Sequence, residues 1–79
     1  MNNSMADAAR RINALHVHLE AKTAEYAALV RDNLLTVEEA AACLAGADAK
    51  KREELDAPAR GPSGLDIYRL CIQQAVDNS

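Results

Sequence analysis

The stretch NLLTVEEAAACLAG, residues 33–46, decides the fold of this chain, because it carries a helix stop and a helix start side by side. Asn33 favours a helix end, since asparagine tolerates the left-handed conformation that helix C-termini often need. Thr36 is followed three positions later by Glu39, which is the spacing of a capping box. Only two leucines separate the stop from the start. The stretch therefore predicts a helical hairpin.

Upstream of the hairpin, apolar residues recur at alternating spacings of three and four, which predicts a long first helix over residues 5–32. The apolar stripe consists of Met5, Ala8, Ile12, Leu15, Leu19, Tyr26 and Leu29, and Lys22 occupies one position within it. Ser4, with Asp7 three residues later, is a candidate N-cap. A helix of this length spans about 42 Å, whereas a compact domain of this size is about 30 Å across. The first helix is therefore expected to overhang the rest of the molecule.

Downstream, the pattern predicts a second helix over residues 36–45, ended by Gly46 in the position of a C-terminal cap. Asp48 is a candidate N-cap for a short helix over residues 49–55. A Pro-containing loop follows, and a last helix is predicted over residues 63–76, begun by Ser63. The expected fold is all-α, a small three- or four-helix bundle that forms one domain over residues 1–79.

Composition limits the class of protein. Of the 79 residues, 49% are apolar, but none is Phe or Trp, which predicts a thin core that association with a protein would supplement. A net charge of -3 argues against a general nucleic-acid binder. We find no apolar run long enough for a membrane span and no signal peptide. Cys43 and Cys71 are predicted to lie on apolar helix faces as reduced thiols, so a cytoplasmic location is expected.

The sequence contains no recognisable catalytic or metal-binding motif. His16 and His18 are two positions apart, so on a helix they point about 200° away from each other and cannot share one ion. No Gly-rich phosphate loop or nucleophile–base pair can be assembled either. We therefore expect neither enzymatic activity nor a cofactor nor a metal.

The leading functional hypothesis is a non-enzymatic protein–protein interaction module, such as a small adaptor or inhibitor from a phage or mobile element that acts on a larger host complex. The expected contact residues are Ile12, Leu15, Leu19, Lys22, Tyr26, Glu38 and Glu39. Lys22 either extends its charge past the edge of the stripe or sets the register of an interface by meeting a partner's carboxylate. A purely structural homodimer is an alternative.

A second alternative comes from residues 35–44, LTVEEAAACL. This string resembles the first helix of excisionase-like and MerR-like helix-turn-helix modules, which often read Leu-Thr-x-Glu-Glu-Ala-Ala. The resemblance implies a tight turn at residues 46–48 and a DNA-reading helix that carries Lys50, Lys51 and Arg52. The resemblance covers about ten residues and then departs from the family pattern. The acidic residues Glu53 and Glu54 come directly after Lys50, Lys51 and Arg52, and no wing-like strand is found.

Overall fold

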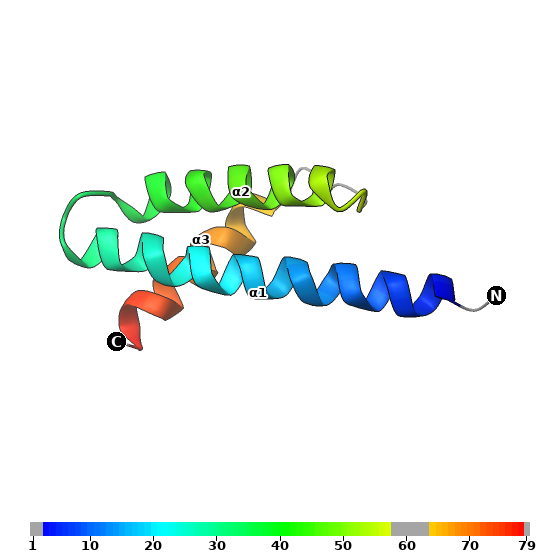
Figure 1. Cartoon of the computed structure of the whole chain (residues 1–79). Helices are drawn as coiled ribbons and strands as arrows, with labels where there is room; N and C mark the ends of the chain where they lie inside the picture. The colour runs from blue at the N-terminus through cyan, green and yellow to red at the C-terminus, as the bar shows by residue number, and fades with distance from the viewer. Residues whose placement is uncertain (1–2, 58–63, 79) are drawn as a thin grey trace.

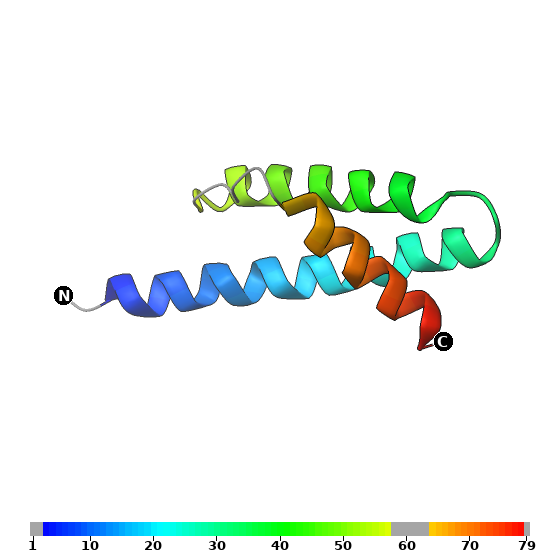
Figure 2. The same ribbon diagram turned by 180° about the vertical axis from the view of Figure 1, so that it is seen from behind.

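The computed structural model describes residues 3–57 and 64–78, with side chains from residue 5 onward, and these residues form three helices and no strand. The helices are α1 (Asn3–Arg31), α2 (Val37–Glu54) and α3 (Gly64–Asp77). Helices α1 and α2 lie side by side and antiparallel, and α3 crosses both of them on one side (Figures 1 and 2). The predicted all-α bundle is confirmed, with three helices.

The stop at the end of α1 forms as predicted. Asn33 has a φ of 62°, in the left-handed region. The Leu34 N–H donates to the Leu29 carbonyl at 2.9 Å, and the Asn33 N–H donates to the Val30 carbonyl at 3.0 Å. This pair of bonds is the Schellman motif, and it satisfies carbonyls that the helix end leaves without partners.

The start of α2 is the predicted capping box. The Thr36 Oγ1 accepts a hydrogen bond from the Glu39 N–H at 3.0 Å, and the Thr36 N–H donates to Glu39 Oε1 at 2.9 Å. The connection between α1 and α2 is therefore fixed at both ends by local hydrogen bonds, and these bonds turn the chain back on itself.

The predicted break at Gly46 is wrong, because residues 37–54 form one continuous helix. Gly46 is exposed and does not have a positive φ, so it does not act as a cap. A glycine inside a helix costs only about 1 kcal/mol, and the surrounding Ala, Lys and Glu residues are strong helix formers. The helix instead ends at a second Schellman motif. There Asp56 has a φ of 56° and the Ala57 N–H donates to the Arg52 carbonyl at 2.8 Å.

The other two predicted starts have different outcomes. Helix α1 is described from Asn3, so Ser4 lies within the helix and is not its N-cap. Ser63, the predicted cap of the last helix, lies outside the described residues, and α3 is described from Gly64.

Asp48 is a buried carboxylate in the middle of α2, where the sequence predicted a helix cap. It is 1% exposed and accepts a hydrogen bond from the hydroxyl of Tyr68 on α3. Its Oδ1 also accepts a 2.7 Å bond from Arg52 Nε, one turn further along α2. Asp48 therefore links α2 to α3 within the packed interior.

The core is small and relies on close approach of the helices. Ala40, Ala41 and Leu44 of α2 pack against Tyr68 and Ile72 of α3, and residues of α1 border this cluster. Two fully buried alanines bring the backbones close together but bury little apolar area. A thin core is what the composition predicted.

Helix α1 extends beyond the other two helices, as its length predicted. Figures 1 and 2 show its N-terminal part passing the ends of both α2 and α3. The molecule measures 50 × 25 × 17 Å, and its radius of gyration is 13.8 Å, against about 12 Å for a compact chain of this length. Every residue from 5 to 13 is exposed; we call residues 5–13 the projecting segment.

Candidate functional sites

The apolar stripe of α1 divides into a buried half and an exposed half. Leu15 is 4% exposed, and Leu19, Tyr26 and Val30 pack against the core cluster. Further toward the N-terminus, Ile12 is 55% exposed and Met5 is 80% exposed. Because these residues share one side of the helix, the stripe leaves the protein interior and continues along the projecting segment.

The residues expected to contact a partner are thus placed in several different environments. Ile12 lies on the projecting segment, whereas Leu15 is buried inside the monomer. Glu38 forms an ion pair with Arg69 of α3, at 2.8 Å, and Glu39 takes part in the capping box. Leu19 and Tyr26 border the core. Ile12 is therefore the one large apolar member of the expected set that is exposed on the surface.

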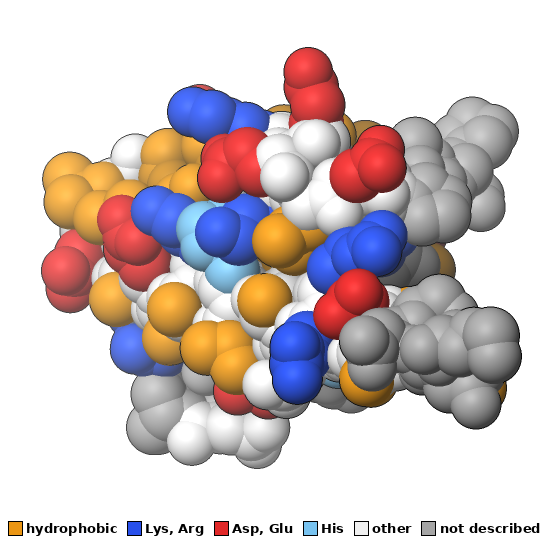
Figure 3. Space-filling model, turned by 45° about the vertical axis from the view of Figure 1, so that its right-hand side comes forward, with side chains coloured by type: hydrophobic (Ala, Val, Ile, Leu, Met, Phe, Trp, Pro, Cys, Tyr) orange, Lys and Arg blue, Asp and Glu red, His pale blue; other side chains and the backbone are white. Residues whose placement is uncertain are grey.

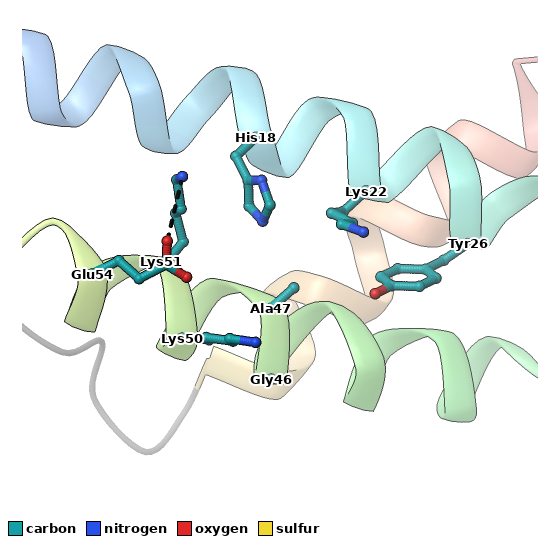
Figure 4. A pocket seen from close by; sticks show the side chains of 8 residues that line it. All are labelled: His18, Lys22, Tyr26, Gly46, Ala47, Lys50, Lys51 and Glu54. Carbon is teal, nitrogen blue, oxygen red and sulfur yellow. Dashed lines mark ion pairs between the residues drawn. The ribbon is translucent and has the colours of Figure 1, made fainter.

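A cleft of about 330 Å³ lies between α1 and α2. Its lining consists of His18, Lys22 and Tyr26 from α1, and Gly46, Ala47, Lys50, Lys51 and Glu54 from α2. Figure 4 shows the α1 side chains pointing toward α2 and Lys51 pointing back toward α1. We call this the basic cleft, because it contains three lysines and a single carboxylate.

The basic cleft contains more positive than negative charge after its ion pairs are counted. Glu54 lies 3.8 Å from Lys51, and Glu25, which is not part of the lining, lies 3.4 Å from Lys22. Lys50 forms no ion pair with a described residue. The basic side chains in Figure 3 gather beside a histidine on the displayed face, and acidic side chains lie around them. In a chain of net charge -3, this is a local reversal of sign.

The two histidines lie on different sides of α1, in agreement with the 200° separation. His18 lines the basic cleft, whereas His16 lines a groove of about 410 Å³ between α1 and α3. That groove is mainly apolar and includes Leu19, Cys71 and Ala75. Within the described part of the chain, no three His, Cys, Asp or Glu residues are grouped as metal ligands.

The residues of the DNA-binding alternative are not arranged as a helix-turn-helix module. The turn expected at residues 46–48 is helical, so Lys50, Lys51 and Arg52 belong to the same helix as Thr36's capping box. Lys51 pairs with Glu54, and Arg52 bonds to the buried Asp48. Only Lys50 and Lys51 of the three line the basic cleft.

Cys43 and Cys71 are both exposed and free, so neither lies on the buried side of its helix, although Cys71 lines the mainly apolar groove. The buried stripe of α2 passes through Ala41, Leu44 and Asp48, and that of α3 passes through Tyr68 and Ile72. The cysteines lie beside these stripes. Alanine-rich helices contain apolar residues on several sides, so the sequence pattern did not single out the buried side.

The basic cleft was not predicted from the sequence. Its lysines are separated by a hairpin, and only the positions of α1 against α2 bring Lys22 near Lys50 and Lys51. The one signal available was the charge of Lys22 within an apolar stripe, which indicates that something other than a packed core faces this position.

No helix of the described residues combines the length and the apolar character that crossing a bilayer requires. Compared with protein-family models, curated proteins and solved structures, the chain matches none of them.

Proposed function

We propose that the protein is a non-enzymatic protein-binding module that docks through the projecting segment of α1. The observation that carries the proposal is the continuation of the buried stripe of α1 into solvent, through Ile12 and Met5. Isolated exposed apolar residues are ordinary on protein surfaces. Here the exposed residues Ile12 and Met5 continue a stripe whose C-terminal half is packed in the bundle. A continuous apolar stripe of this kind is the surface by which one helix pairs with another.

The expected partner surface is an amphipathic helix or an apolar groove that accepts a helix. The thin core supports this view, because a partner laid along the projecting segment would add apolar burial that the monomer lacks. A small adaptor or inhibitor that acts on a larger complex would work in this way. Burying the side chain of Ile12 against a partner would stabilise the complex by about 1.5–3 kcal/mol.

The test compares two substitutions of equal chemistry on opposite sides of α1. Ile12→Asp places a carboxylate on the proposed surface. Val17→Asp is the matched control, because Val17 is 59% exposed and points about 140° away from Ile12. Neither residue is packed in the core, so both variants are expected to fold with stabilities within about 0.5 kcal/mol of the parent.

The measurement is photo-crosslinking in the source cell with a crosslinker at position 12 or position 17, together with sedimentation of the purified protein. We expect a partner that is recovered from position 12 only and that binds Ile12→Asp about 10- to 100-fold more weakly, from the burial energy at 1.4 kcal/mol per factor of ten. If the chain crosslinks to itself, and sedimentation shows a dimer that becomes a monomer in Ile12→Asp, the partner is a second copy of this chain. Equal recovery from both positions, or none from either, would refute the proposal.

A further inference from the structure

The basic cleft combines charge with hydrogen-bond donors from two facing helices. Lys22 and the Tyr26 hydroxyl come from α1, and Lys50 and Lys51 come from α2, on the opposite wall (Figure 4). An ammonium group offers three N–H donors and a phenol one O–H donor. Between them stands His18, whose ring can donate a further hydrogen bond. Donors on two facing helices suit an anion that can accept bonds on several sides.

Two of the three lysines of the basic cleft are partly buried, and Lys50 is exposed. The side chains of Lys22 and Lys51 are each only partly exposed, 34% and 27% respectively. Their long stems therefore lie partly against protein surface. Lys51 is paired with Glu54 and Lys22 with Glu25, so the charge of Lys50 is left over for a ligand.

Gly46 adds open space to the cleft. It lines the cleft from the middle of α2, where a glycine weakens a helix relative to alanine. The fold does not require it, because its φ is not positive and a Cβ built on it would meet nothing within 4 Å. The missing side chain instead leaves the helix backbone open toward the cleft, where a ligand can approach it closely.

We propose that the basic cleft binds an oligophosphate, a diphosphate or longer, either free or as part of a nucleotide. Lysine is a common phosphate ligand, and the lysines are spread over both walls, which suits linked phosphates more than a single one. The volume of about 330 Å³ lies at the lower end of the range for small-molecule sites, about 300–1,000 Å³. This inference uses residues other than the projecting segment, so it stands or fails independently of the proposed function.

The experiment is isothermal titration calorimetry of the full chain at physiological salt, with inorganic phosphate, pyrophosphate, ADP and adenosine as probes. We expect pyrophosphate to bind more tightly than phosphate. Equal affinities for pyrophosphate and ADP would show that the cleft recognises the diphosphate alone. Tighter binding of ADP would show that the nucleoside is recognised as well. Adenosine alone should not bind. Absence of binding by both pyrophosphate and ADP at millimolar concentration would overturn the proposal.

Three variants make the test specific to the cleft. Lys50→Ala should weaken pyrophosphate binding about tenfold, while Arg10→Ala, which removes the same charge from the projecting segment, should change it less than twofold. Gly46→Ala should raise the Tm by about 3–8 °C, since alanine favours helix, and yet weaken binding about tenfold. Equal losses in Lys50→Ala and Arg10→Ala would show non-specific attraction and overturn the proposal. So would unchanged affinity in Gly46→Ala.

Discussion

Replacement of Asp48 is the sharpest test of how this small bundle is held together. In Asp48→Ala the hydroxyl of Tyr68, a buried residue, loses this acceptor, and Arg52 loses the carboxylate that lies 2.7 Å from its Nε. Removing one partner of a buried charged pair typically costs about 3–5 kcal/mol. A folded domain of this length has only about 4–12 kcal/mol of stability in total. One substitution should therefore remove a large part of it.

The cost can be measured by urea and thermal unfolding followed by circular dichroism, which suits an all-α chain. At about 4–8 °C per kcal/mol for a domain of this size, the Tm of Asp48→Ala should fall by about 12–40 °C. Asp7→Ala is the matched control, because Asp7 pairs with Arg10 at the surface, at 3.6 Å. Such exposed pairs contribute about 0–1 kcal/mol.

A double-mutant cycle separates the Asp48–Tyr68 bond from general damage to the core. Tyr68→Phe keeps the ring in place and removes the hydroxyl, at an expected cost of about 1.5–3 kcal/mol for a bond to a charged group. The destabilisation of the double variant Asp48→Ala/Tyr68→Phe should be smaller than the sum of the two single-variant destabilisations by about 0.5–3 kcal/mol. If Asp48→Ala is as stable as Asp7→Ala, or if the two costs are additive, the reasoning is refuted.

The two ends of the connection between α1 and α2 give the remaining predictions. Thr36→Ala should lower the free energy of unfolding by about 1 kcal/mol, because the Glu39 N–H loses its side-chain acceptor; chemical denaturation checks this, and a change below about 0.3 kcal/mol would contradict it. Asn33→Ala should cost about 1–2 kcal/mol, since alanine is strained at a φ of 62°. Asn33→Gly, compared in the same denaturation series, should cost less than Asn33→Ala, and the reverse order would contradict the account.

The parts of the fold that depend on neighbouring residues were predictable from the sequence. The Asn33 stop and the Thr36–Glu39 box use hydrogen bonds that span only a few residues, so their signals are complete in a short stretch. The overhang of α1 followed from length alone. These features could be predicted without knowing which helices pack against each other.

The parts that depend on tertiary contacts were not predictable in this way. Gly46 and Asp48 together look like a helix end followed by a helix start, and nothing nearby in the sequence contradicts that interpretation. The decisive residue is Tyr68, twenty positions after Asp48, whose hydroxyl meets the carboxylate inside the bundle. The basic cleft was missed for the same reason, because Lys22 and Lys50 become neighbours only once the hairpin has closed.

The buried Asp48 also suggests the order in which the chain folds. Closing a loop costs more entropy as the loop lengthens, so α1 and α2, joined by a short capped connection, are expected to pair first. At that stage Asp48 is still hydrated. The arrival of α3 completes contacts as distant as that of Arg31 Nη1 with the Ala75 carbonyl, 44 positions apart, and it removes water from the carboxylate as Tyr68 takes its place. Docking of α3 therefore combines apolar gain with dehydration of a charge, and we expect it to be the late step of folding and the early step of unfolding.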